Sequence, residues 1–378
     1  MNKKKKILVL YSTGGMGHKK AATAVFKAFK DKTDADIDVE IMDVLDFANS
    51  VYKFLYLKLY VFLMSRGKLL WGALYYFSNI PLVDTLTRSV RGRTDSMSLP
   101  KLVPTLVEKN PDAIVATHFM LSSVAGILKK HKNFSSKLFT LVTDYGPHSF
   151  WLSRYIDRFF VGSTSVKQEM MKRDVPEDKI DVTGLPVGEE FRRKYDIADL
   201  RKKYGLEEGK KTIFLISGGF GVGPIGKILL SLNKCRADIQ VITVCGHNEK
   251  IYENIRLLEK KLKYKVVLFG FTDKVAELMS ASDLMITKAG GISVTEALNT
   301  SLPMVMFASM PGQETWNEDF LLRNGAAVKA KKISDIPVVA DKILLSPGSR
   351  SVFGRNIEHI RKPRAADDIV DIVLEGLK

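Results

Sequence analysis

A glycine-rich turn that ends in a histidine is the first feature of this sequence that could form a reactive site. The turn, Gly14-Gly15-Met16-Gly17-His18, follows the apolar run Lys5–Tyr11 and precedes a segment, residues 19–30, whose apolar residues recur at helical spacing. Glycines let a ligand approach the backbone closely, and the start of a helix favours negative charge. We expect His18 to face a ligand at the carboxyl end of a sheet, with helix capping or core packing as its alternatives.

Two further polar groups follow apolar runs that should form neighbouring strands. Asp144 comes after the run Leu138–Val142, and Thr117-His118 comes after the run Ala113–Ala116. Open α/β sheets bind ligands where the carboxyl ends of their parallel strands meet. Asp144 can act as a base, can position His18 or a substrate hydroxyl, or can cap the next segment. For Thr117, helix capping is the stronger alternative to a role in the site.

The second half of the chain holds its own strand, glycine pair and helix start. Residues 287–297 read Thr-Lys-Ala-Gly-Gly-Ile-Ser-Val-Thr-Glu-Ala and follow an expected strand. The glycine pair leaves backbone N–H groups free for a diphosphate, to which Ser293 can donate a further hydrogen bond. Glu296, on the first turn, can accept hydrogen bonds from both hydroxyls of a ribose; as an alternative it caps the helix.

A polar cluster comes later, after the apolar run Met304–Phe307. It reads Pro311-Gly312-Gln313-Glu314, with Asn317 three residues further on. Amide and carboxylate groups so placed can bind several hydroxyls of a sugar, and a simple turn would not need three of them.

Two series of strands are needed to position these loops. Helical segments separate most of the strands, as parallel βαβ topology requires, and each series begins with a strand and a glycine loop. We therefore predict an α/β protein with two Rossmann-like, doubly wound domains, at residues 1–195 and 196–350, and a C-terminal helical segment at 351–378 that packs back towards the first domain. The expected strands are residues 5–11, 39–42, 113–116, 138–142 and 158–161, then 211–216, 239–244, 266–269, 284–287 and 304–307.

The composition limits the classes of function. With 378 residues, 46% of them hydrophobic, the chain can bury two cores, and its formal net charge of +16 predicts attraction to nucleic acid, anionic lipid or a phosphate-bearing substrate. The basic residues accompany leucine-rich stretches rather than isolated stacking aromatics, so we do not expect nucleic-acid binding. Two cysteines, which fall in separate elements, indicate neither a disulfide framework nor a four-thiolate metal site, and a reducing cytosol fits.

One segment, residues 51–93, interrupts the regular order of strands and helices. It is dense in Tyr, Phe and Leu, and it carries seven basic residues against one acid, Asp84. Such a segment favours contact with an anionic membrane surface, because apolar groups enter the acyl boundary while basic groups meet headgroups. A helical layer packed on the sheet is the alternative. The uncharged run of this segment, residues 69–83, is too short to cross a bilayer, so we expect no transmembrane helix.

These motifs resemble glycosyltransferase family 28, and within it the diacylglycerol glycosyltransferases. The resemblance covers nearly the whole chain. It rests on the Gly-Gly-x-Gly-His loop, Val-Thr-Asp, Gly-x-Pro-Val at 184–187, Cys-Gly-His-Asn at 245–248, Thr-Lys-Ala-Gly-Gly and Pro-Gly-Gln-Glu, the last two being highly specific in this order and spacing. It implies a GT-B fold, a UDP-sugar in the C-terminal domain, a lipid acceptor on the N-terminal domain, inversion at the anomeric carbon and no required metal or other cofactor.

The resemblance also assigns residues. The resemblance places His18 near the acceptor hydroxyl, as general base or as organiser of the acceptor site, and Asp144 is the second catalytic candidate. The donor-binding residues it implies are Gly218, Gly219 and Phe220 near the diphosphate and sugar, Gly246, Phe271 by the uracil, Lys288, Gly290, Gly291, Ser293, Glu296 at the ribose, and Gln313, Glu314 and Asn317 at the hexose. The acceptor or membrane residues are Gly17, Tyr56, Tyr60, Arg66, Lys68, Trp71, His118 and Trp151.

The sequence thus predicts an inverting glycosyltransferase that moves glucose or galactose from UDP to diacylglycerol, peripheral on the cytoplasmic face of the cell membrane. Two rivals remain. One is a transferase of N-acetylglucosamine to the lipid-linked peptidoglycan precursor, and the other is a non-catalytic, membrane-bound UDP-sugar sensor. The sequence leaves open the sugar, the number of sugars added, the activating lipid and the oligomeric state.

Overall fold

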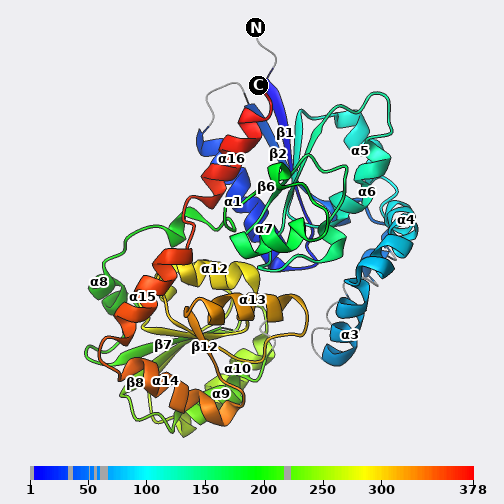
Figure 1. The fold of residues 1–378 in the computed structure, drawn as a ribbon. Coiled ribbons are helices and arrows are strands. Elements are labelled where there is room, and N and C mark those ends of the chain that lie inside the picture. The colour runs from blue at the N-terminus through cyan, green and yellow to red at the C-terminus, as the bar shows by residue number, and fades with distance from the viewer. Residues whose placement is uncertain (1–3, 33–36, 51, 55–57, 60–66, 217–222) are drawn as a thin grey trace. The chain divides into compact units, whose positions relative to one another are not determined.

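Two parallel sheets of six strands each form the framework of this computed structural model (Figure 1). The structure describes residues 4–32, 37–50, 52–54, 58–59, 67–216 and 223–378, and at positions 68, 88, 89 and 91 it describes the backbone alone. The chain divides into two units. The first comprises Met1–Gly188, Pro311–Gln313 and Lys362–Lys378, and the second comprises Glu189–Met310 and Glu314–Arg361.

The first unit is built on a sheet with the strand order β2-β1-β3-β4-β5-β6. Its central strands are buried on both faces, which explains their continuous apolar runs, and the core gathers residues such as Leu8, Ile114 and Leu138. All pairings are parallel. The strands are β1 (Lys5–Tyr11), β2 (Ile37–Asp43), β3 (Ala113–Ala116), β4 (Lys137–Leu141), β5 (Arg158–Phe160) and β6 (Ile180–Asp181).

Helices of the first unit connect these strands. In Figure 1 the C-terminal helix α16, in red, lies beside α1, in blue, and the two are in contact. The chain therefore returns to the first unit at its C-terminal end. The helices are α1 (Met16–Lys32), α3 (Lys68–Ser78), α4 (Pro81–Ser98), α5 (Leu102–Lys109), α6 (Met120–Leu128), α7 (Thr164–Met171) and α16 (Ala365–Glu375), with 3-10 turns η1 (Val44–Phe47), η2 (Ser149–Trp151) and η3 (Glu177–Lys179).

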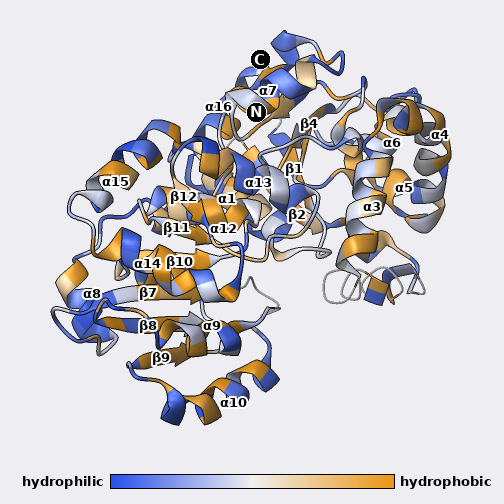
Figure 2. Cartoon of the chain, turned by 60° about the horizontal axis from the view of Figure 1, so that its bottom comes forward, coloured by the Kyte–Doolittle hydropathy of each residue, from blue (hydrophilic) through white to orange (hydrophobic). Residues whose placement is uncertain are grey.

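The second unit repeats the plan with the strand order β12-β11-β10-β7-β8-β9. Figure 2 shows its strands β8 to β11 largely in the hydrophobic colour, and a core that includes Ile213, Val241 and Ile286 packs around them. The strands are β7 (Lys211–Ile216), β8 (Ile239–Val244), β9 (Val266–Phe269), β10 (Leu284–Thr287), β11 (Met304–Met306) and β12 (Ala327–Lys329).

The helices of the second unit follow its strands in turn. They are α8 (Ile197–Lys203), α9 (Ile225–Leu232), α10 (Glu249–Leu258), α11 (Val275–Ser280), α12 (Gly291–Asn299), α13 (Gln313–Arg323), α14 (Ile336–Leu344) and α15 (Ser349–Ile360), with 3-10 turns η4 (Glu189–Phe191), η5 (Glu259–Lys261) and η6 (Ile333–Asp335). The first residue of α13, Gln313, groups with the first unit.

The predicted fold class is confirmed, and each of the ten predicted strands is present within two residues of its expected bounds. Two edge strands, β6 and β12, were not predicted; they are two and three residues long, too short to leave a pattern in the sequence. The first helix begins at Met16 rather than after the turn, so His18 lies on its first turn.

Gly184 is a point where the returning C-terminal segment fixes the backbone of the first unit. Its φ is +86°, and a Cβ built on it would overlap the Cβ of Lys362. We expect Gly184→Ala to lower the free energy of unfolding by more than the 1 to 3 kcal/mol or so of left-handed strain alone, as measured by urea denaturation.

Gly209→Ala is the matched control for this prediction. Gly209 has a φ of +79°, and a Cβ there meets nothing within 4 Å. The control should therefore report the strain without the overlap. An equal loss of unfolding free energy in both variants would show that Lys362 makes no steric overlap with a side chain at position 184.

Candidate functional site

The ring of His18 is held at the carboxyl edge of the first sheet by residues that follow two other strands. Its Nδ1 lies 2.6 Å from the carbonyl oxygen of Thr117, after β3, and 3.2 Å from the hydroxyl of Thr143, after β4. A carbonyl oxygen can only accept a hydrogen bond, so Nδ1 carries the ring proton. The lone pair of the neutral ring is therefore on Nε2, which has no hydrogen-bond partner among the described residues.

Thr117 links three elements at this edge. Its backbone N–H donates to the carbonyl oxygen of Leu10 in β1, and its hydroxyl donates to the carbonyl oxygen of His18 at 2.9 Å. Helix capping was the stronger alternative for this residue. The N-cap of α6 is instead Phe119, whose own side chain makes no capping hydrogen bond. Thr117 thus fixes both the backbone and the ring of His18.

A second histidine, His118, packs edge-on against the first. The ring centroids are 4.8 Å apart and the planes meet at 81°. The Nδ1 of His118 accepts a hydrogen bond from the backbone N–H of Met120, so its proton is on Nε2. Trp151 lies 6.2 Å from the His18 ring, and its carbonyl oxygen accepts a hydrogen bond from Ser122. The predicted residues His18, His118 and Trp151 therefore form one cluster, with Gly17 adjacent in the chain.

Both histidine rings are kept neutral by their surroundings. Desolvation lowers the pKa of His18 to about 4, although the hydrogen bond to Thr117 opposes this effect. Desolvation, with the nearby His18 as a smaller cause, lowers the pKa of His118 well below its usual value. His18 is nevertheless partly accessible at the surface, so a ligand can reach it. A neutral imidazole with an available Nε2 is the form that accepts a proton.

Asp144 is partly buried in the loop after β4, beside Tyr75 of α3. Burial of Tyr75 is the main cause of the raised pKa of this phenol, and the charge of Asp144 adds to it. The residue of this loop that hydrogen-bonds the His18 ring is Thr143, to which the sequence analysis gave no role. Two signals in the sequence point to Thr143, namely its place after a strand and its membership of the Val-Thr-Asp motif. The catalytic assignment of Asp144 stays a prediction.

In the second unit, helix α12 begins at the carboxyl end of β10 with open backbone donors. Its N-cap is Gly290, which has extended backbone angles and makes no side-chain capping bond. The first N–H groups of the helix, starting at Gly291, therefore lack an intrahelical acceptor, and Ser293 lies on the same turn. Glu296, on the next turn, is 2% exposed. This helix start has the chemistry of an anion site.

Two polar residues at the start of α13 make hydrogen bonds to the loops that precede α12 and α13. Glu314 accepts hydrogen bonds from the backbone N–H of Met310 at 2.6 Å and from Lys288 at 3.3 Å. Asn317 is fully buried and donates to the carbonyl oxygen of Ala289 at 2.9 Å. These contacts tie the loop before α13 to the loop before α12. Binding of a hexose by Gln313, Glu314 and Asn317 stays a prediction.

A flat aromatic pair stands at the carboxyl ends of β8 and β9. The rings of His247 and Phe271 stack with their centroids 4.2 Å apart and an angle of 14° between planes. Phe271 is 57% exposed, and Gly246 turns the chain with a φ of +59°. An exposed aromatic face can stack on a planar base, which agrees with the predicted uracil site without testing it.

Several predicted residues lie outside the described residues. They are the donor residues Gly218, Gly219 and Phe220 and the acceptor or membrane residues Tyr56, Tyr60 and Arg66, together with the side chain of Lys68. Among the described residues, no group of three or more His, Cys, Asp or Glu side chains is arranged to hold a metal ion.

The helical arm formed by α3 and α4 exposes many apolar side chains. Leu69 is 87% exposed, Leu86 70% and Met97 77%, and the one acid of residues 51–93, Asp84, is buried at 2%. Trp71 lies on α3 and is partly buried. Among its described helices, the structure has none long and apolar enough to cross a membrane. Most of the exposed side chains of the arm are apolar, and the basic side chain of Arg93 is exposed beside them.

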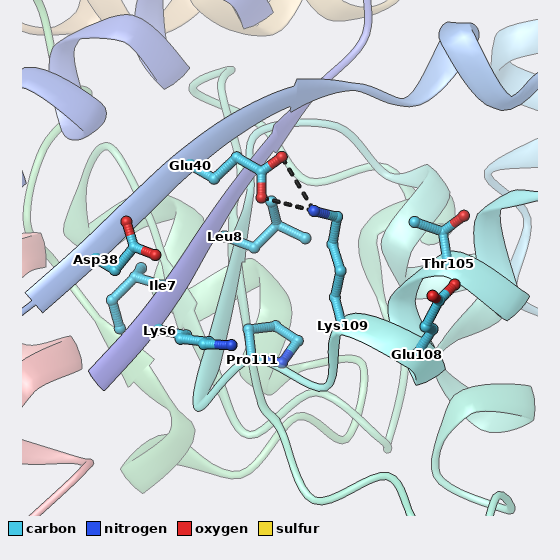
Figure 3. A pocket seen from close by; sticks show the side chains of 9 residues that line it. All are labelled: Lys6, Ile7, Leu8, Asp38, Glu40, Thr105, Glu108, Lys109 and Pro111. Atoms are coloured by element: carbon cyan, nitrogen blue, oxygen red, sulfur yellow. Dashed lines mark hydrogen bonds and ion pairs between the residues drawn. The ribbon is translucent and has the colours of Figure 1, made fainter. Parts of the chain in front are cut away.

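A cavity of about 380 Å³ lies at the opposite, amino end of the first sheet (Figure 3). Lys109 reaches across it to both carboxylate oxygens of Glu40, at 2.9 and 3.2 Å. The remaining lining includes Asp38 and Glu108 opposite Lys6. The cavity is remote from His18 along the strands, so it does not belong to the His18 cluster.

Comparison with known proteins assigns the two units to known families. Residues 18–187 match the family model "Monogalactosyldiacylglycerol (MGDG) synthase", and residues 212–329 match "Glycosyltransferase family 28 C-terminal domain". A processive diacylglycerol β-glucosyltransferase of Bacillus cereus is 30% identical, over 99% of this chain and 94% of its own length. The chain belongs to glycosyltransferase family 28. The family predicted from its motifs is thereby confirmed.

Solved structures support the fold. MurG of Acinetobacter baumannii superposes with a TM-score of 0.59 at 14% identity, covering 98% of this chain and 99% of that one. Anabaena HepE in complex with UDP-glucose gives a TM-score of 0.57 at 15% identity, covering 98% and 99%. These likenesses confirm the GT-B fold.

The pH dependence of stability tests the surroundings of His18. The unfolded chain binds a proton on this residue near pH 6.5 and the folded chain only near pH 4. As the pH falls between these values the unfolded state takes up more protons, so the free energy of unfolding should fall. Urea denaturation across this pH range should show a shallower fall in His18→Gln. An unchanged pH dependence in the variant would mean that water reaches the ring.

Proposed function

We propose that this family 28 enzyme transfers glucose from UDP-glucose to the free hydroxyl of 1,2-diacylglycerol, with inversion, at the cytoplasmic face of a membrane. The observation that carries the proposal is the neutral His18, whose proton is on Nδ1 and whose Nε2 has no partner among the described residues. Glucose is chosen over galactose because the 30% identical relative is named a glucosyltransferase. The MGDG synthase match over residues 18–187 supports a diacylglycerol acceptor rather than the peptidoglycan precursor.

The reaction follows from the roles of the two clusters. Nε2 of His18 takes the proton of the acceptor hydroxyl while the hydroxyl oxygen forms a bond to the anomeric carbon. The bond from that carbon to the diphosphate oxygen breaks, and UDP leaves with the electron pair. Backbone N–H groups at the start of α12, with Ser293, stabilise the negative charge that develops on the diphosphate.

The donor is assigned to the second unit for reasons of chemistry. The exposed face of Phe271 suits uracil, the start of α12 suits the diphosphate, and Glu296 suits the ribose hydroxyls. Lys288 and Glu314, which pair at 3.3 Å, follow β10 and β11 and suit the sugar end of the donor. Asn317, also of the second unit, completes that proposed subsite. A non-catalytic UDP-sugar sensor would need these groups too, but it would not need a neutral histidine that can accept a proton, as His18 can.

Contact with an anionic membrane is assigned to the helical arm. Its exposed leucines and methionine can enter the acyl boundary, since burial of one such side chain is favourable by roughly 1.5 to 3 kcal/mol. The formal net charge of +16 adds attraction to anionic headgroups. Lys58, which lies over the ring of Phe54 at 4.2 Å, combines both kinds of group just before the arm.

The first test is a transfer assay with a His18 variant. Labelled UDP-glucose or UDP-galactose is offered with diacylglycerol in vesicles containing anionic lipid, and the lipid products are resolved. We expect labelled glycolipid from UDP-glucose, and a kcat at least about 100-fold lower in His18→Ala, because general base catalysis contributes that much.

His131→Ala is the matched control, because His131 is exposed after α6 and should be dispensable. Near-normal turnover by His18→Ala would remove this residue from the chemistry. Absence of labelled lipid from either donor, with UDP still bound, would reject the diacylglycerol reaction.

The second test concerns the arm. In Leu69→Gln/Leu86→Gln, co-sedimentation with anionic vesicles should show an affinity lowered about tenfold or more, because two exposed leucines lose their apolar contact. Leu257→Gln, at a position in α10 that is 76% exposed, is the control and should bind as the parent does. If the parent, the double variant and the Leu257→Gln control bound the vesicles equally, the membrane contact would lie outside the arm.

A further inference from the structure

Two acceptors share the one proton on Nδ1 of His18. The Thr117 carbonyl oxygen lies 2.6 Å away and the Thr143 hydroxyl oxygen 3.2 Å away. Because the carbonyl fixes the proton on Nδ1, the hydroxyl oxygen of Thr143 must accept from the same N–H, and its own proton stays available. Thr143 is 4% exposed and lies two residues after the end of β4, next to Val142, whose backbone N–H donates to the carbonyl oxygen of Phe160 in β5, so the sheet sets its position.

The two acceptors differ in what they depend on. The Thr117 oxygen belongs to the backbone, which is anchored to β1 through Leu10. This carbonyl oxygen therefore remains available as an acceptor whatever the side chain at position 117. The second acceptor exists only because residue 143 has a hydroxyl, so a change of side chain there can remove it while leaving the ring proton on Nδ1.

We propose that Thr143 is a positioning residue for the transfer reaction, which holds the His18 ring by its Nδ1–H and stabilises the ring after Nε2 has taken the acceptor proton. This proposal rests on the proposed role of His18 as the base. When Nε2 gains a proton, the ring becomes a cation and the hydrogen bond from Nδ1 to Thr143 becomes charge-assisted, roughly twice as strong as a neutral one. Its effect is therefore larger in the transition state than in the ground state, which lowers the barrier.

The experiment compares Thr143→Val, Thr143→Ser and Thr140→Val in the full-length chain. Thr140 is a matched control because it lies in β4, is fully buried, and has a hydroxyl with no hydrogen-bond partner among the described residues. The valine exchange there replaces the same hydroxyl by a methyl group three residues earlier in the chain, at a position with no hydrogen bond to His18 among the described residues. Thr143→Ser keeps the accepting oxygen.

Two readouts are taken. The first is kcat and KM for diacylglycerol in the transfer assay. The second, which needs no activity, is the ¹⁵N NMR titration of the His18 ring, assigned with His18→Gln. We expect Thr143→Val to lower kcat about tenfold with KM unchanged, the change expected from loss of one hydrogen bond to a charged group. Its His18 should also lose its proton at a lower pH than the parent, while Thr143→Ser and Thr140→Val match the parent.

The outcomes separate this proposal from the proposed function. A parent-like kcat and a parent-like His18 titration in Thr143→Val would overturn the positioning role. A parent protein that makes no glycolipid would overturn the proposed function, and the NMR titration would still decide whether Thr143 stabilises the charged ring. A fall of kcat in Thr140→Val equal to that in Thr143→Val would also overturn the proposal, because it would point to a loss of packing in β4.

Discussion

The hydrogen bonds of Thr117 are the constraint on which the first unit's site depends. This residue follows β3, bonds to Leu10 of the neighbouring strand β1, and binds both the backbone and the ring of His18 at the start of α1. Parallel pairing of β1 with β3 places the two strand ends side by side, so the register of the sheet decides the place of the ring. The position and the proton arrangement of the His18 ring therefore depend on the register between β1 and β3.

The same junction explains why the histidines stay neutral. Apolar strands and aromatic rings surround the pair, and the cost of charging a ring away from water is larger than the gain from its hydrogen bonds. The two rings also have opposite proton arrangements, because His18 donates from Nδ1 and His118 accepts there. The Nε2 of His18 can therefore accept a hydrogen bond, whereas the Nε2 of His118 can donate one.

Much of this could be predicted from the sequence, because buried parallel strands are continuous apolar runs and glycine loops mark their carboxyl ends. The runs at β1, β3, β7 and β8 gave their bounds directly, whereas β6, with two residues, could not be seen. His18, His118 and Trp151 were each singled out in the sequence, the first as a catalytic residue and the other two as acceptor or membrane residues, but the partner predicted for His18 was Asp144 and not this pair. The hydrogen bond between the Thr143 hydroxyl and the His18 ring could not be predicted. The two residues are 125 positions apart in the sequence, and the direction of the bond depends on which ring nitrogen carries the proton. Likewise, no pattern shows that Asn317 is buried against Ala289.

The contact of α16 with α1 has a consequence for the order in which the molecule can assemble during synthesis. The second unit lies almost wholly within residues 189–361, so its core can close as soon as that stretch has left the ribosome. The first unit is begun earlier, yet the helix that packs on α1 is translated only after the whole of the second unit. Until then α1, whose first turn carries His18, lacks this neighbour. The unit made first is thus completed last.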